Sequence, residues 1–325
     1  MKSSRRRVLR LAAGTAALSA ICRAARADTY PSRPVRLLVG FAAGSTTDIL
    51  GRLMGQWLSE RLGQQFVIEN RPGAGGNVGA DAMVHSPPDG YTLLMVPPAV
   101  AANPALYTNL SFDFLKDAAP VAGVVRVPNV VEVNPSVPVK TLPELIDYAK
   151  ANPGKLSFAS AGIGTASHLA GQLFNVMTGL HLQHVPYRGD GPAMVDLIGG
   201  QVQVGFATMT ASIAYIRADK LRPLAVTTLK RSDALPNIPT VSEFVPGFEA
   251  SSWFGIAAPK DTPADIVDKL NHETNAGLAD AKIAARLADM GGMPLTGSPA
   301  DYGKLIADET AKWGKVIRDA GIKAE

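Results

Sequence analysis

The sequence predicts an α/β protein made of two lobes, each with a mostly parallel sheet covered by helices. Short apolar runs rich in β-branched residues alternate with helical patterns over residues 35–95 and again over residues 142–227. This alternation is typical of parallel strands joined by crossover helices. Two longer extended runs, near residues 128 and 252, flank the second series. We interpret them as paired strands that cross between the lobes.

Each expected element has a local signal. Residues 49–62 carry apolar side chains at helical spacing and stop at Gly63, a residue type that favours helix ends. Apolar runs bounded by Gly, Pro or Asn predict the strands. In order, we expect strand 35–39, helix 49–62, strand 66–69, helix 78–84, strand 92–95, helix 142–151, strand 156–159, helix 166–178, strand 182–185, helix 193–198, strand 202–207 and strand 224–227.

The chain is long enough for two lobes. It has 325 residues, of which 46% are apolar and 18% charged, so a sizeable core can form. From Thr262 onward the apolar residues form helical stripes, which we expect to pack onto the first lobe. We therefore assign residues 28–128 and 253–325 to lobe 1 and residues 129–252 to lobe 2.

The first 27 residues read as an export signal. SRRRVLR at residues 4–10 resembles the twin-arginine motif, with Val8 where Phe is usual, and a short apolar run and an Ala-Arg-Ala cleavage site follow. An ordinary Sec signal is the alternative, and both routes lead to the periplasm with cleavage after Ala27. The apolar run is shorter than the roughly 20 residues of a membrane span, so we expect a soluble mature protein.

Removal of this segment changes the charge. Residues 1–27 hold seven of the 32 basic residues and none of the 28 acidic ones, which leaves 25 against 28 and a net charge of about −3. Nucleic-acid binding therefore loses its main support. The only cysteine, Cys22, is also removed, so no disulfide, thiol nucleophile or cysteine metal site is expected.

The first-lobe loop, residues 40–48 with the sequence GFAAGSTTD, joins a strand to a helix. Such loops lie at the ligand-binding edge of an open parallel sheet, and a helix N-terminus there offers free N–H groups to an anion. Ser45 and Asp48 have capping-box spacing, so we favour a structural role for Asp48 over that of a general base. For the hydroxyls of Ser45, Thr46 and Thr47, capping and ligand contact remain alternatives.

The second-lobe loop, residues 160–165 with the sequence SAGIGT, has a parallel arrangement. Thr165 is the expected N-cap, and the glycines let backbone amides face a ligand. For His168, a core or capping role and ligand contact are both open. Tyr187 follows the next strand and is expected to reach the cleft, together with Arg188 and Asp190 unless these two form an exposed ion pair.

Enzyme signatures are missing. The two Gly-x-Gly stretches lack the third glycine of a dinucleotide fingerprint, and neither a Gly-x-Ser-x-Gly elbow nor a phosphate-binding loop occurs. His181 and His184, three residues apart on an expected strand, point to opposite faces, so a shared metal is not expected. We predict no catalytic residue, metal or cofactor.

Several sequence blocks together resemble the substrate-binding proteins of tripartite tricarboxylate transporters, also called Bug receptors. The resemblance covers residues 29–325. The blocks are YPSRP at residues 30–34, GFAAGSTTD, ENRPGAGGN at 69–77, DGYTL at 89–93, residues 160–169, VPYRG at 185–189, LPNIPT at 235–240 and SWFG at 252–255.

This resemblance implies a type II periplasmic-binding-protein fold that closes on a small carboxylate and delivers it to the large and small permease subunits. It implies a monomer that performs no chemistry. In the family, amides and hydroxyls of the two loops hold the carboxylate, with bridging waters. The implied ligand-binding residues are Phe41, Gly44, Ser45, Thr46, Thr47, Asp48, Ser160, Gly162, Gly164, Thr165 and His168, with Tyr187 and Thr208 added.

The chain departs from the family pattern at a few positions. Gly44-Ser45 stands where a Gly-Gly pair is usual, and Gly40 often is a proline. Ala207-Thr208 stands where many members have Asp after the Val-x-Phe strand. Ser45 is expected to narrow the pocket or to add a hydrogen bond. Mono-, di- and tricarboxylates, amino acids and aromatic acids all remain compatible ligands.

Two other functions remain as alternatives. The first is a periplasmic sensor, which uses the same cleft to report a carboxylate to a two-component kinase. An α/β hydrolase or dehydrogenase is a further alternative, although its motifs are missing. A related transcription-regulator domain is excluded because the chain has an export signal and no helix-turn-helix.

Overall fold

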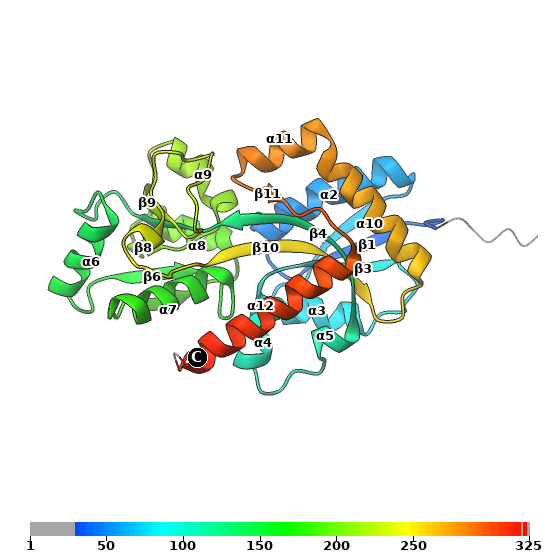
Figure 1. The fold of residues 1–325 in the computed structure, drawn as a ribbon, viewed down its shortest axis with the longest axis horizontal. Helices are drawn as coiled ribbons and strands as arrows, with labels where there is room; N and C mark the ends of the chain where they lie inside the picture. The colour runs from blue at the N-terminus through cyan, green and yellow to red at the C-terminus, as the bar shows by residue number, and fades with distance from the viewer. Residues whose placement is uncertain (1–29, 320, 324–325) are drawn as a thin grey trace, which may run out of the picture.

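The computed structural model describes residues 30–319 and 321–323, so the predicted export signal lies outside the described residues. Two mixed α/β units lie side by side, and β4 (Ala118–Pro128) and β10 (Ser251–Pro259) run along the axis between them (Figure 1). One sheet has six strands in the order β11-β4-β10-β3-β1-β2, and the other has five in the order β7-β6-β8-β5-β9. The predicted fold class is confirmed.

The six-stranded sheet forms the first lobe. Its alternating part is parallel, because β1 (Val35–Val39) lies between β2 (Phe66–Asn70) and β3 (Thr92–Val96) with the same direction. β10 and β11 (Met293–Pro294) add antiparallel pairs, so the sheet is mixed rather than mostly parallel. The helical segments α2 (Thr46–Leu62), η2 (Ala74–Gly76), α3 (Asn77–Val84), α4 (Ala99–Leu106) and α5 (Phe114–Asp117) connect its strands.

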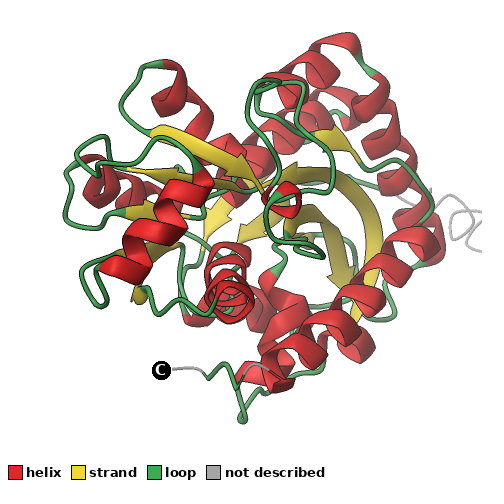
Figure 2. Ribbon diagram, turned by 60° about the vertical axis from the view of Figure 1, so that its left-hand side comes forward, coloured by secondary structure: helices red, strands yellow, loops and turns green. Residues whose placement is uncertain are grey.

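The five-stranded sheet forms the second lobe. β6 (Ser157–Ser160) pairs in parallel with β7 (Gln183–Pro186) and β8 (Val204–Gly205), whereas β5 (Val130–Val133) is antiparallel to β8 and β9 (Arg222–Val226). Helices surround both sheets (Figure 2). Those of the second lobe are α6 (Leu142–Ala151), α7 (Ala166–Thr178), α8 (Asp190–Ile198), α9 (Met209–Arg217) and η3 (Val241–Glu243). The residue bounds of the lobes stay a prediction.

Some elements differ from the prediction. α4 and α9 were not expected. In α4, six of the eight residues are buried, so its sequence lacks the polar face that makes a helix recognisable. α8 begins at Asp190, three residues before the expected start, and the strand expected over residues 202–207 shrinks to β8. The earlier start of α8 matters because it brings Asp190 to a helix N-terminus.

The two lobes are joined at a hydrogen-bonded crossing centred on Asn129, which lies between β4 and β5. The backbone N–H of Asn129 donates to Thr227 Oγ1 over 2.9 Å, and Ser252 Oγ donates to the side-chain oxygen Asn129 Oδ1 over 2.7 Å. Asn129 also forms an antiparallel bridge with Thr208. All three partners of this crossing are buried, so the predicted crossing strands meet in the interior of the molecule.

The C-terminal helices α10 (Ala264–Ala279), α11 (Ala281–Asp289) and α12 (Pro299–Asp319) follow β10. The start of α12 packs on the first lobe as predicted, since Tyr302 and Ile306 share a core cluster with Leu38. Its end belongs to another cluster, in which Trp313 joins Phe248 of the second lobe. α12 therefore reaches both lobes, as its course in Figure 1 also shows.

Within residues 30–319 and 321–323, the structure has no helix whose length and apolar character would suit a membrane crossing.

Candidate functional site

The N-termini of α2 and α7 meet at one small cavity between the lobes. The cavity has a volume of about 30 Å³, which is room for about two water molecules. Both predicted loops contribute to it, and so do two residues of β10. Its lining residues are Phe41, Ser45, Thr46, Thr47, Ala161, Thr165, Ala166, Ser167, Asp190, Thr208, Ser252 and Phe254.

The first-lobe loop is held by its own capping residues. Ser45 has an extended backbone and its hydroxyl accepts from the Asp48 amide over 3.3 Å, so it is the N-cap of α2. The Asp48 carboxylate reaches back to the Gly44 amide at 3.0 Å, one residue before the position that a capping box would give it. Gly44 has a φ of +81°, a conformation that glycine adopts without strain.

Asp48 connects the first-lobe loop to neighbouring side chains. Its carboxylate also accepts from Arg52 at 2.9 and 3.0 Å and from Asn70 Nδ2 at 2.9 Å. Burial alone would raise the pKa of Asp48, but the hydrogen bonds from Arg52, Gly44 and Asn70 outweigh it and hold the pKa below its ordinary value. With both oxygens occupied by these donors, Asp48 braces the loop, as the sequence predicted.

The second-lobe loop is closed by internal hydrogen bonds. Thr165 is the N-cap of α7, since its hydroxyl accepts from the His168 amide, and the same hydroxyl donates to Gly162 O over 2.6 Å. Ser160 Oγ accepts from the Gly162 amide over 3.1 Å and pairs with His184 Nε2 over 2.6 Å. The Ser160 hydroxyl is therefore occupied inside the lobe, whereas Thr165 faces the small cavity.

Two stacked histidines support this loop from behind. The rings of His168 and His184 lie 4.2 Å apart between centroids, and Phe158 stacks on the other ring face of His184. His168 Nδ1 accepts from the Gly164 amide over 3.2 Å. Burial lowers the pKa of His168 to about 4 and that of His184 to about 3, so both rings are neutral at pH 7. His168 lines neither cavity of the cleft.

Acidification from pH 7 to pH 5 is expected to destabilise the protein by on the order of 3 kcal/mol through these two histidines. Their pKa values in the folded state lie below 6.5, so the unfolded chain takes up protons that the folded chain excludes, and stability falls as the pH drops below 6.5. Urea unfolding at both pH values measures this loss. His184→Gln should roughly halve it, and the exposed His181→Gln should not. An equal pH dependence in the wild type and both variants would show that His168 and His184 do not cause the loss of stability.

A larger cavity of about 230 Å³ adjoins the first. Phe41, Ala161 and Tyr187 belong to its wall, and the first two also line the small cavity. The Tyr187 hydroxyl donates to Asp196 over 2.7 Å, so its ring rather than its hydroxyl is available. The wall is completed by Pro72, Gly73, Ala74, Gly75, Gly76, Tyr107, Gly162, Ile163, Pro186 and Arg188.

The ion pair considered for Arg188 and Asp190 is wrong. Arg188 is exposed at the larger cavity, whereas Asp190 is buried at the smaller one and bonds to Thr46 of the first lobe. Thr208 joins the same group, because its hydroxyl bonds to the Thr46 hydroxyl. Thr46 and Thr208, both predicted site residues, thus meet across the cleft.

Sequence reasoning missed the side chains that β10 and α7 add to the small cavity, Ser252, Phe254 and Ser167. The SWFG block was noted, but its pattern did not show which residues face the cleft.

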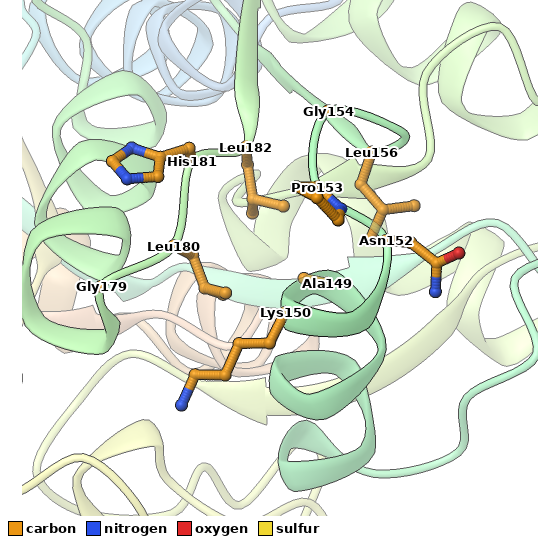
Figure 3. A pocket seen from close by; sticks show the side chains of 10 residues that line it. All are labelled: Ala149, Lys150, Asn152, Pro153, Gly154, Leu156, Gly179, Leu180, His181 and Leu182. Atoms are coloured by element: carbon orange, nitrogen blue, oxygen red, sulfur yellow. The ribbon is translucent and has the colours of Figure 1, made fainter.

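A further pocket of about 170 Å³ lies at the C-terminal ends of α6 and α7, with Lys150, Asn152 and His181 at its edge (Figure 3). It shares no lining residue with the cleft cavities, so it is not part of the candidate site.

Known proteins resemble this chain over most of its length. The protein BugT of Bordetella pertussis is 39% identical over 300 residues, which are 91% of this chain and 92% of BugT. The structure of Rpa4515 of R. palustris with adipate is 40% identical, with a TM-score of 0.88 and coverage of 90% of this chain and 98% of that one. MatC of Rhodopseudomonas palustris with bound malate is 32% identical, with a TM-score of 0.84 and coverage of 89% and 100%.

A family model described as the tripartite tricarboxylate transporter family receptor matches residues 50–322. The match begins within α2, after the first-lobe loop, and spans both lobes, including the whole second-lobe loop. The resemblance noted from the sequence is confirmed, and the chain belongs to the receptor family of the tripartite tricarboxylate transporters.

Proposed function

We propose that this chain is a periplasmic receptor that binds a small organic carboxylate in the cleft between its lobes and delivers it to the permease subunits of a tripartite tricarboxylate transporter. The observation that carries this proposal is the convergence of two capped helix N-termini on one cavity. Such helix ends attract anions through free N–H groups and the helix dipole.

The two cavities suit different parts of such a ligand. The small cavity is lined by hydroxyls and helix ends, and it suits the carboxylate or the waters that bridge it. The larger cavity is bordered by Phe41, Tyr107 and Tyr187, and it suits the carbon skeleton. Phe41 and Gly44 to Thr47 of the first lobe, with Gly162, Gly164 and Thr165 of the second, are the proposed contacts, and Asp48 holds the first-lobe loop in place.

We further propose binding without turnover. Asp48 and His168 are the groups that a catalytic reading would use, and both are occupied by hydrogen bonds that shape their loops. The mature receptor works as a monomer in the periplasm after removal of residues 1–27. MatC and Rpa4515, the relatives with bound malate and adipate, support a carboxylate ligand for this cleft.

Organic acids are expected to raise the melting temperature of the protein purified from the periplasm. A ligand at about 100 times its Kd stabilises the folded state by about 2.7 kcal/mol, and differential scanning fluorimetry with mono-, di- and tricarboxylates of increasing length detects such a shift. Thr47→Val, which removes a hydroxyl from the small cavity, should weaken binding about five- to tenfold. His181→Ala in the pocket of Figure 3 is the matched control. No shift with any acid would refute the proposal.

A further inference from the structure

A carboxylate of the second lobe binds the helix end that the first lobe presents to the cleft. Asp190, the first residue of α8, accepts from the Thr46 amide over 3.4 Å and from the Thr46 hydroxyl over 3.2 Å, both at Oδ2. Asp190 is only 6% exposed. The contact crosses from one lobe to the other, so it exists only when the lobes are close together.

The hydroxyls around Asp190 point their protons toward it. Thr46 donates its hydroxyl proton to Asp190, so the hydrogen bond between the Thr46 and Thr208 hydroxyls has Thr208 as its donor. The chain of hydrogen bonds thus runs from Thr208 through Thr46 to the carboxylate. Burial raises the pKa of Asp190 above its ordinary value, and the two hydrogen bonds from Thr46 oppose this rise because they favour the ionised form.

Within the described part of the chain, Asp190 has no cationic partner in a salt bridge. The neighbouring acid is Glu132, which is fully buried and accepts from Ser212 Oγ over 2.8 Å. Burial, with the charge of Asp190 added, raises the pKa of Glu132 to about 8. Glu132 is therefore mainly protonated at pH 7, and the charge of Asp190 is one cause of this.

The second oxygen of Asp190 is available to a ligand. Among the described residues, none donates a hydrogen bond to Oδ1, and Asp190 lines the small cavity beside Ser45 and Thr165. The cavity therefore presents donors from two helix ends and one strong acceptor. A bare carboxylate there gains the donors but is repelled by Asp190, whereas a ligand that also carries a donor satisfies both.

We propose that Asp190 is a specificity-determining residue, which selects carboxylates that carry a hydrogen-bond donor, a hydroxyl or an ammonium group, on the carbon next to the carboxylate. The inference rests on the proposed function, because it assumes that a carboxylate binds at the small cavity. It adds the class of acid that fits: 2-hydroxy or 2-amino acids rather than unsubstituted ones.

The experiment compares acids of equal length that differ only at this carbon. The sets are propionate, lactate and alanine; succinate, malate and aspartate; and glutarate, 2-hydroxyglutarate and glutamate. Kd values by isothermal titration calorimetry are expected to favour a donor-bearing acid by about ten- to a hundredfold, the value of one charge-assisted hydrogen bond. Comparison of the hydroxy with the amino acid in each set shows which donor is used.

Two variants separate selection from folding. Asp190→Asn keeps an oxygen for Thr46 and presents an amide to the cavity, so the preference should fall to within about threefold of unity or reverse toward the unsubstituted acid. Asp190→Ala should lose the preference as well. Asp147→Asn, which removes an exposed charge from α6, should keep the wild-type ratio.

The outcomes distinguish the role of Asp190 from the receptor function itself. Acids that bind the wild type without a preference, or a preference that survives in Asp190→Asn, would overturn the role of Asp190 and leave the receptor function intact. A failure of every acid to bind at any length would overturn the proposed function, and the inference with it.

Discussion

Asp48→Ala is expected to destabilise the protein by on the order of 3 kcal/mol and to abolish carboxylate binding. The substitution removes the acceptor of the Gly44 amide, one of the two acceptors of Asn70 Nδ2, and the carboxylate partner of Arg52. Each hydrogen bond to a charged group contributes about 1.5–3 kcal/mol, and less where the donor is exposed, as Gly44 and Arg52 are. Because the first-lobe loop loses its brace, the amides of the α2 N-terminus should no longer hold their arrangement.

Urea unfolding at pH 7 and ligand titration measure both effects. Glu60→Ala is the control, since Glu60 lies on the same helix but bonds only to exposed Gln56, and it should change stability by less than about 0.5 kcal/mol. The pKa of Asp48 is lowered in the folded state, so its contribution is present at neutral pH and is lost as the pH falls through that value. A loss below 1 kcal/mol in Asp48→Ala would show that the loop does not depend on it.

Gly75→Ala is expected to weaken ligand binding at least tenfold by preventing full closure of the lobes. A Cβ at Gly75, in the first lobe, would lie 2.6 Å from the carbonyl oxygen of Ile163 in the second-lobe loop. That neighbour is backbone, which cannot turn away as a side chain can, so the lobes must separate instead. Closed states of two-lobed receptors depend on such close approach.

Gly63→Ala is the matched control for this variant. Both glycines have a left-handed φ, +63° at Gly75 and +72° at Gly63, but a Cβ at Gly63 meets no atom within 4 Å. Both variants should lose about 1 kcal/mol of stability through backbone strain, and only Gly75→Ala should lose affinity and show a larger radius of gyration by small-angle scattering with ligand present. Equal affinities in the two variants would show that closure does not depend on the close approach of Gly75 to Ile163.

Local signals in the sequence predicted most of the fold. Gly63 and Gly179 end α2 and α7 in the left-handed conformation, and Ser45 and Thr165 cap their starts, so both helices were placed closely from sequence alone. The crossing strands were also found, because Pro128 breaks one extended run where β4 ends. These features depend on neighbours in the chain, which the sequence displays directly.

The parts that were not predicted depend on contacts distant in the chain. The contact between Thr46 and Asp190 joins residues 144 positions apart and requires both lobes in place. The His168–His184 stack likewise depends on the pairing of β6 with β7, and the sequence left the role of His168 open. The start of α8 was missed because the sequence Gly-Asp-Gly-Pro is more typical of a turn than of a helix.

The buried crossing at Asn129 also limits the routes by which a solute can enter. Asn129, Thr227 and Ser252 are each fully buried and joined by hydrogen bonds, so no solute can pass between these three residues while the bonds are kept. The larger cavity has none of these three residues in its wall, and exposed Arg188 lies on its border. In a receptor of the proposed kind, we expect the solute to enter and leave through this larger cavity, and a membrane partner then has to face it to receive the solute.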